Sequence, residues 1–169
     1  LVDIRGEPCS FPGSFASAVQ VLFFFKHDCE TCRLVAPAVE ALHLAVGGEQ
    51  LRALAISQST PADTQEFAEQ AKLTLPVTLD TTLKVSSIYG FDAVPALVLT
   101  RSDGTVLEKS EGWVKDEWNA LVKRAVDACS GEDVDLSGVD TLVDRLPRSR
   151  PGCGSRAHDP IVARRLAVA

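Results

Sequence analysis

The chain of 169 residues contains no methionine, and its first residue is leucine. We therefore expect the natural start to be missing, which leaves a removed signal or anchor open. No apolar segment reaches the roughly 18 residues of a membrane span, so we expect no membrane span in this chain. Lysine and arginine form no block before the far C-terminus and the net charge is −6, which argues against a nucleic-acid partner.

The chain also lacks the ligands of an ordinary zinc site. Cys29 and Cys32 stand three residues apart, whereas Cys9, Cys129 and Cys153 are isolated and the three histidines form no second pair at zinc-finger spacing. An odd number of cysteines argues against a fully paired disulfide framework and leaves at least one thiol available.

What the chain does contain is a dithiol between a buried strand and a helix. Cys29-Glu30-Thr31-Cys32 follows the apolar run Val21–Phe25 and precedes an amphipathic stretch at 31–46. The helix start offers unpaired N–H groups and a positive dipole end, which lower the pKa of a thiol placed there. We expect Cys29 to be the nucleophile and Cys32, one turn later, to resolve a mixed disulfide.

Hydrophobic periodicity gives the remaining elements. Hydrophobic residues make up 46% of the chain, which is enough for a substantial core. The pattern predicts strands at 19–25, 51–56, 76–79, 96–100 and 105–109, and helices at 31–46, from Pro61 after a Ser59-Thr60 cap, at 82–89 and at 115–128. Alternating strands and helices that end in a hairpin and a helix predict a three-layer α/β domain.

At this point the chain resembles the thioredoxin-like superfamily. The resemblance rests on the apolar strand before the dithiol, on Pro37 five residues after Cys32, and on Tyr89–Leu99, in which the family carries a cis-proline. It implies a central mixed sheet flanked by helices, and a cis Val94–Pro95 bond whose backbone shapes the substrate groove beside the dithiol.

Two segments make the chain more similar to the TlpA/ResA and redoxin branch. They are an N-terminal hairpin at 1–18 and an insertion at 57–88. The resemblance covers a domain at 1–128 and leaves an irregular C-terminal extension at 129–169 of unknown role. It favours a bacterial protein on the extracytoplasmic or periplasmic side, with the cytoplasm as the alternative.

The chain departs from the family at its proton acceptors. Phe23 stands where thioredoxin has a buried aspartate, and Val35 where ResA-like proteins have an acid. Glu30 could serve instead, Lys26 and His27 could stabilise the thiolate, and Thr31 is a further candidate modulator. The alternative is that Glu30, Lys26 and His27 are simply solvated residues near an exposed turn. The residues before the dithiol also lack the proline and threonine of the peroxidatic motif of peroxiredoxins, which disfavours peroxidase chemistry, and a copper role lacks its methionine.

The extension is basic near Cys153. We expect a solvated, flexible tail containing a short amphipathic piece within 130–144. Cys153 lies between two glycines and near arginines, which favours its thiolate and suggests a third redox or metalloid-binding thiol that exchanges with Cys29. The alternatives are an unreactive loop cysteine, or one paired with Cys9 or Cys129.

These features predict a thiol-disulfide oxidoreductase acting on protein or small-molecule disulfides. It would need no cofactor beyond an external dithiol or disulfide partner. Two other interpretations stay open: a binding module that holds a soft metal or metalloid ion with the dithiol and Cys153, and a redox sensor that docks to a partner through the tail.

Overall fold

A six-stranded mixed sheet forms the centre of the protein. The structure is a computed structural model that describes residues 1–4, 6–8, 19–46, 51–128 and 134–161. The sheet order is β1-β4-β3-β2-β6-β7, with β2, β3 and β4 parallel and the other pairs antiparallel. Its strands are β1 (Val2–Asp3), β2 (Val19–Phe25), β3 (Leu51–Ser57), β4 (Val77–Leu79), β6 (Ala96–Arg101) and β7 (Val106–Glu111). This is the expected thioredoxin-like arrangement, with boundaries within two residues of the predicted ones for the five strands that were predicted.

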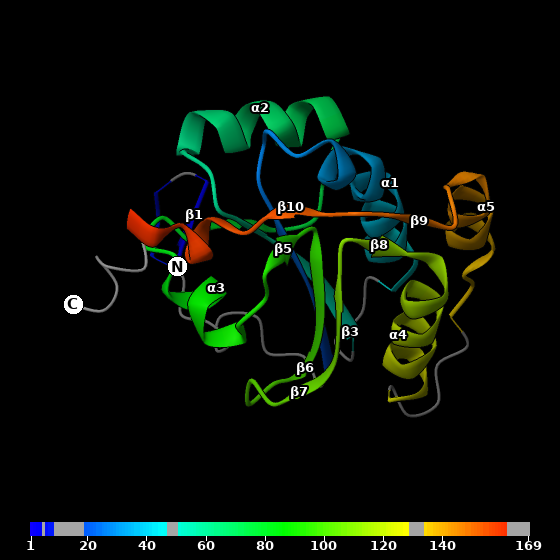
Figure 1. The fold of residues 1–169 in the computed structure, drawn as a ribbon. Coiled ribbons are helices and arrows are strands. Elements are labelled where there is room, and N and C mark those ends of the chain that lie inside the picture. The colour runs from blue at the N-terminus through cyan, green and yellow to red at the C-terminus, as the bar shows by residue number, and fades with distance from the viewer. Residues whose placement is uncertain (5, 9–18, 47–50, 129–133, 162–169) are drawn as a thin grey trace.

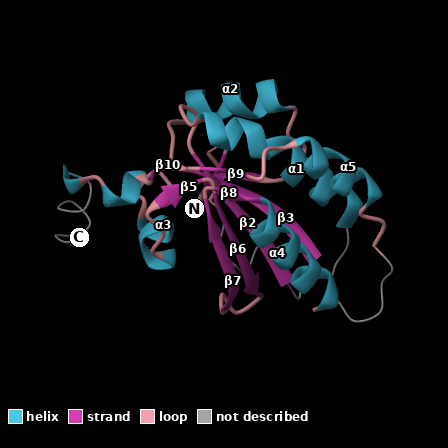
Figure 2. Cartoon of the chain, turned by 45° about the vertical axis from the view of Figure 1, so that its right-hand side comes forward, coloured by secondary structure: helices cyan, strands magenta, loops and turns pink. Residues whose placement is uncertain are grey.

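Helices cover both faces of this sheet. They are α1 (Glu30–Val46), α2 (Pro61–Ala71), α3 (Lys84–Tyr89), α4 (Lys115–Asp127) and α5 (Ser137–Arg145). Figures 1 and 2 show α1, α4 and α5 on one side of the sheet and α3 on the other, with α2 above the end of the strands. None of the described helices is long and apolar enough to cross a membrane.

Strand β2 lies at the middle of the core because both of its faces are covered. All seven of its residues are buried, Gln20 among them, as the apolar run Val21–Phe25 predicted for a covered strand. Its side chains alternate between the faces. Phe25 packs on Phe67 of α2 with ring centres 4.5 Å apart, and Phe24 packs on Phe91 at 4.7 Å. This packing fixes the end of β2 from which the chain turns into the dithiol.

Local hydrogen bonds explain where two of the helices begin. Thr60 caps α2, since its hydroxyl accepts from the Asp63 N–H at 3.2 Å, as the sequence predicted. The buried Asp80 carboxylate accepts from the N–H groups of Val85 at 3.3 Å and Ser86 at 2.7 Å, and so holds the start of α3. Both contacts lie in the predicted insertion at 57–88.

At the other end of the chain, the predicted N-terminal hairpin is only partly described. Strand β1 pairs antiparallel with β4, and Val2 also bridges to Pro8. The rest of the hairpin, including Cys9, lies outside the described residues, as does Cys129.

The expectation of a flexible tail was wrong for the described part of the extension. Helix α5 overlaps the amphipathic piece predicted within 130–144 and buries Val139 and Val143. Beyond it, β9 (Ser149–Arg150) pairs with β8 (Trp113–Val114), and β10 (Cys153–Gly154) pairs with β5 (Ala93–Val94). Figure 1 shows this segment in orange, running across the end of the sheet from α5 toward the short 3-10 helix η2 (Arg156–His158). This part of the extension is held against the domain because its residues form hydrogen bonds and ion pairs with backbone and charged groups of the domain, as described below.

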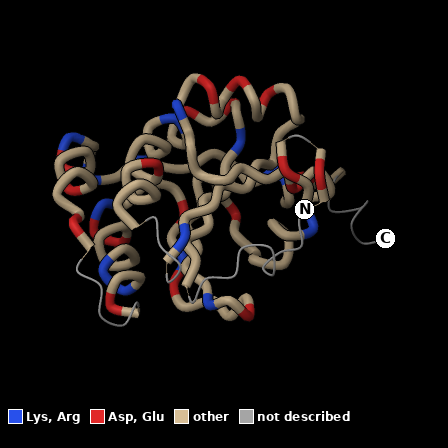
Figure 3. The backbone as a smooth tube through the Cα atoms, turned by 180° about the vertical axis from the view of Figure 1, so that it is seen from behind, with Lys and Arg blue, Asp and Glu red and all other residues tan. Residues whose placement is uncertain are grey.

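Charged residues of both signs are distributed along the described chain. Figure 3 shows Lys and Arg interspersed with Asp and Glu along the chain. Several are paired at the surface, for instance Arg124 with Glu108 at 2.7 Å and Lys123 with Asp127 at 2.6 Å.

Candidate active site

Cys29 lies just before α1, at the position that usually carries a capping side chain. Its carbonyl oxygen accepts from the Arg33 N–H at 3.1 Å, and its sulfur accepts from the Cys32 N–H at 3.3 Å. Ser, Thr or Asp at this position accepts from the same N–H in ordinary helices. The Cys29 sulfur therefore faces unpaired N–H groups at the positive end of the helix dipole.

The two sulfurs of the motif differ in acidity. Hydrogen bonding from the Cys32 thiol, the largest influence, outweighs burial and together with the Cys153 thiol lowers the pKa of Cys29 to about 5. Burial raises the pKa of Cys32 well above its ordinary value, and the hydrogen bond and charge of Cys29 raise it further. Near neutral pH the negative charge consequently rests on Cys29 and the proton on Cys32. Both cysteines are free thiols with 0% exposure.

The segment before Pro95 forms the opposite wall of the site. The Val94–Pro95 peptide bond is cis, and Val94 is fully buried. When protonated, the Cys29 thiol donates to the Val94 carbonyl oxygen at 3.4 Å. Pro95 is held in turn by Gly112, whose N–H donates to the Pro95 carbonyl at 2.8 Å and whose φ of +72° suits glycine. The structure thus brings Cys29, Cys32, Val94 and Pro95 together.

Cys153 also belongs to this cluster. It pairs with Val94 across the two-stranded β5–β10 sheet, and Val94 is the residue whose carbonyl oxygen lies 3.4 Å from the Cys29 sulfur. The thiol and backbone N–H of Cys153 both contribute to the lowered pKa of Cys29. Burial, followed by its contact with Cys29, raises the pKa of Cys153. Its side chain is partly exposed, unlike those of the two cysteines of the motif.

The two residues between the cysteines hold the extension rather than the sulfurs. The Thr31 hydroxyl donates to the Pro151 carbonyl at 2.8 Å, and the Glu30 carboxylate pairs with Arg150 at 2.6 Å. The Glu30 side chain is 83% exposed, so it lies in solvent above the helix start.

Lys26 and His27 interact with acidic groups. Lys26 lies 4.0 Å from the carboxylate of Asp28. The His27 ring nitrogen lies 3.3 Å from the Ser59 hydroxyl and 3.6 Å from the Asp63 carboxylate, which directs the ring to the start of α2. Burial alone would raise the pKa of Asp28, but the charges of Lys26 and Arg156 lower it overall.

Sequence reasoning missed the residues that anchor the extension beyond Cys153. Buried Gln58 donates to the Ser155 hydroxyl at 2.9 Å, and its side-chain oxygen accepts from the Arg156 N–H at 2.9 Å. The Arg156 guanidinium also reaches the Gln58 carbonyl at 3.0 Å and Asp28 at 3.3 Å. No local sequence pattern predicts contacts between residues about a hundred positions apart. The opposite charges of the tail arginines and of the acidic domain were a signal that could have indicated these contacts.

The geometry gives no support to the metal-binding alternative. Within the stretches that the structure describes, no three His, Cys, Asp or Glu side chains are arranged as a metal site.

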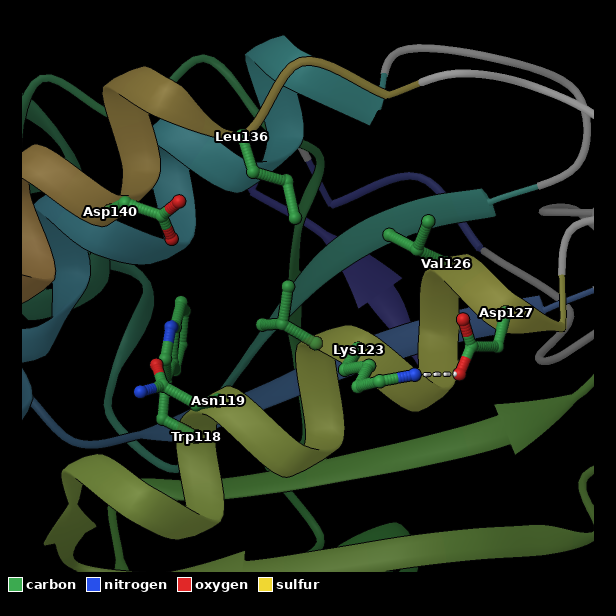
Figure 4. Close-up of a pocket in the computed structure, with 8 residues that line it drawn as sticks. Trp118, Asn119, Lys123, Val126, Asp127, Leu136 and Asp140 are labelled. Carbon is green, nitrogen blue, oxygen red and sulfur yellow. Dashed lines mark hydrogen bonds and ion pairs between the residues drawn. The ribbon is translucent and has the colours of Figure 1, made fainter.

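A separate surface hollow between α4 and α5, shown in Figure 4, is lined by Trp118, Asn119, Val122, Lys123, Val126, Asp127, Leu136 and Asp140. Its lining includes no cysteine or histidine, so we assign it no part in the chemistry.

Solved structures show the same fold at low sequence identity. A secreted Mycobacterium tuberculosis disulfide oxidoreductase, homologous to DsbE of E. coli, is 21% identical with a TM-score of 0.59, covering 73% of this chain and 92% of that chain. StoA from Bacillus subtilis is 20% identical with a TM-score of 0.58, covering 72% and 92%. The thioredoxin domain of a thiol-disulfide oxidoreductase from Bacteroides vulgatus is 19% identical with a TM-score of 0.62, covering 73% and 90%.

The family assignment comes from the sequence. No curated protein matches the chain. The sequence model of the AhpC/TSA family matches residues 6–109, a range that contains the dithiol, the insertion and the cis-proline. The match spans more than half of the chain and agrees with the fold and with the redoxin branch expected from the sequence. The protein is therefore an oxidoreductase that belongs to the AhpC/TSA family.

Proposed function

We propose that the protein is a thiol-disulfide oxidoreductase in which Cys29 attacks and Cys32 resolves, acting on protein or small-molecule disulfides. The observation that carries this proposal is the opposite acidity of two adjacent thiols, with the pKa of Cys29 lowered to about 5 and that of Cys32 raised. One sulfur is thereby prepared as a nucleophile, while the other is kept protonated until it is needed.

The reaction runs in two exchanges. The Cys29 thiolate attacks one sulfur of the substrate disulfide, and the other substrate sulfur leaves as a thiolate and takes up a proton. Cys32 then loses its proton and attacks Cys29, which releases the second substrate thiol and leaves a Cys29–Cys32 disulfide. An external dithiol returns the enzyme to its reduced state, so no further cofactor is required.

Deprotonation of Cys32 needs no carboxylate in this arrangement. Both Phe23 and Val35, at the family's acid positions, are buried apolar residues. The charge and hydrogen bonding of Cys29 contribute to the raised pKa of Cys32. Once Cys29 is bonded to substrate, that charge is gone, and the pKa of Cys32 falls to the level that burial alone sets. The leaving substrate thiolate can then accept the proton.

The acidity of Cys29 also bears on the direction of electron flow. Its pKa of about 5 lies between the values of about 7 for thioredoxin and about 3.5 for DsbA. Because a more stable thiolate stabilises the reduced form, we expect a potential between about −270 mV and about −120 mV, less reducing than thioredoxin.

A redox titration tests this function. The protein is equilibrated in glutathione and dithiothreitol buffers, free thiols are alkylated, and each modified cysteine is located by mass spectrometry. Reduction of insulin by dithiothreitol is followed in parallel. We expect a reversible Cys29–Cys32 couple, loss of insulin reduction in Cys29→Ser, and a trapped Cys29–substrate mixed disulfide in Cys32→Ser. A pair that never cycles, with wild-type insulin reduction at the uncatalysed rate, would contradict the proposal.

A further inference from the structure

The place beside the reactive sulfur is occupied by the protein's own chain. Strand β10 runs antiparallel to β5, so Cys153 lies opposite Val94 and Gly154 opposite Ala93. The Ser155 N–H continues the pairing by donating to the Asp92 carbonyl at 2.8 Å. An extended peptide that recognises an open strand edge pairs with it in this way. The extension therefore takes the position that a substrate strand would take next to Cys29.

Two glycines allow the extension to approach β5 closely. A Cβ on Gly152 would lie 2.7 Å from the Val94 oxygen and 3.0 Å from the Ala93 Cβ. A Cβ on Gly112 would lie 2.9 Å from the Gly152 nitrogen. Backbone packs directly on backbone here, which only glycine permits without displacement. The segment is fitted to the groove by its sequence.

Contacts on either side hold the segment in register. Before it, the Lys115 N–H donates to the Arg148 carbonyl at 2.9 Å and the Trp113 ring N–H to the Pro147 carbonyl at 2.7 Å. Over the dithiol, Thr31 binds Pro151 and Glu30 binds Arg150. After it, Gln58 binds Ser155 and Arg156. Glu30 and Thr31, which lie between the two cysteines of the motif, thus help to position the third cysteine, Cys153.

Strand β10 determines which of the three cysteine sulfurs is exposed to solvent. Cys29 and Cys32 have no exposed surface, whereas Cys153 is partly exposed and interacts with Cys29. An external thiol or disulfide therefore meets Cys153 before it meets Cys29 while β10 stays paired with β5.

From these observations, and resting on the proposed function, we propose that Cys153 is a third redox thiol of this enzyme. It is presented by β10 at the substrate's position, and it exchanges with the Cys29–Cys32 disulfide to form a Cys29–Cys153 disulfide.

This exchange balances within the chain. The Cys153 sulfur, as thiolate, attacks Cys29; the Cys29–Cys32 bond breaks, and Cys32 leaves as a thiolate and takes up the proton that Cys153 lost. No electrons enter or leave. An external dithiol then attacks the partly exposed Cys153 sulfur and expels Cys29, whose low pKa makes it the better leaving group. The second thiol of that partner displaces Cys153, which completes a partner disulfide and a fully reduced enzyme.

Oxidised glutathione is the probe that tests the third thiol. In the full-length Cys32→Ser variant, attack at Cys29 or Cys153 forms a mixed disulfide with glutathione. The neighbouring thiol displaces glutathione to leave a Cys29–Cys153 bond, because a thiol held in the same site has a high effective concentration. We expect non-reducing peptide mass spectrometry to find this cross-link as the main product of Cys29. Adding Cys153→Ser is expected to leave Cys29 glutathionylated instead.

A displaced thiol provides the matched control. In Cys32→Ser with Cys153→Ser and Ser149→Cys, the chain carries the same number of cysteines, but the moved thiol lies on β9, at an exposed position against β8. We expect no cross-link from residue 149 to Cys29. Stable glutathionylated Cys29 in the single Cys32→Ser variant, with no bond to Cys153, would overturn the third thiol. That result would not contradict the proposed function if the wild-type Cys29–Cys32 pair still forms a reversible disulfide and the wild-type protein still reduces insulin.

Discussion

At the scale of single residues, Cys29 combines two roles that usually belong to different side chains. Its sulfur caps α1 through the Cys32 N–H and also stands beside the backbone of Val94. The proton that lowers its pKa most strongly comes from another thiol and not from a charged side chain. Acidity in this site is therefore a property of the cysteine cluster.

The first prediction concerns that neighbouring donor. Cys32→Ala removes the largest influence on the pKa of Cys29, so we expect this pKa to rise from about 5 toward the ordinary thiol value. Cys32→Ser keeps a hydroxyl donor at the same position and should raise it less. The measurement is the ultraviolet absorbance of the thiolate against pH in reduced protein, with Cys29→Ser subtracted as the control. An unchanged midpoint in Cys32→Ala would show that another donor dominates.

The same acidity couples folding to pH. The thiol of Cys29 titrates at about 5 in the folded protein, against about 8.5 in an unfolded chain. Between these values folding releases a proton, so the free energy of unfolding of the reduced protein should rise with pH. The stabilisation is fully present above about pH 8.5 and is lost as the pH falls to about 5.

Urea unfolding of reduced wild type and Cys29→Ser across that window measures the effect. The difference between the two slopes isolates Cys29 from other titrating groups. Parallel slopes for the two proteins would mean that the pKa of Cys29 is not lowered by folding.

At the scale of elements, the pairing of β10 with β5 depends on Gly152. Gly152→Ala places a methyl group against the Val94 carbonyl and Ala93, both too close for it, and should separate β10 from β5. We expect iodoacetamide to alkylate Cys29 about tenfold faster in this variant, because overpacking costs roughly 1–3 kcal/mol. Gly154→Ala is the matched control, since the space around that position is open. Equal rates in the two variants would show that the segment does not shield Cys29.

The same elements show what sequence could and could not predict. The apolar run Val21–Phe25 in β2, the cap at Thr60 and the glycine stop at Gly90 are local signals, and the corresponding elements appear where they were predicted. Strands β9 and β10 were missed because Ser149–Gly154 has no apolar alternation. Their pairing is set by glycine packing and by hydrogen bonds to residues 33 to 120 positions earlier in the chain. The dithiol could be predicted from the sequence, whereas the covering of Cys29 by β10 could be recognised only in the tertiary structure.

At the scale of the whole molecule, the choice of disulfide decides how much of the chain is cross-linked. A Cys29–Cys32 bond closes a single helical turn, while a Cys29–Cys153 bond would close a loop of more than a hundred residues. In the chain-entropy treatment, a loop of that length stabilises a protein by about 4–5 kcal/mol.

We therefore expect oxidised Cys32→Ser to resist urea far more than its own reduced form at the same pH. Oxidation of Cys153→Ser, which closes the short Cys29–Cys32 loop, should shift the midpoint little by comparison. Similar shifts in the two variants would contradict the long-range cross-link.

The covered position of Cys29 also has a consequence for chemical damage. A thiolate of low pKa is the form of cysteine that peroxides oxidise first, and an exposed one proceeds through sulfenic acid to irreversible sulfinic acid. Here the sulfur has no exposed surface, and Cys32 and Cys153 both lie beside it. A sulfenic acid formed during a brief opening would condense with either thiol, release water, and become a disulfide that a dithiol can reduce. The strand that closes the groove thereby keeps oxidative injury to the nucleophile repairable.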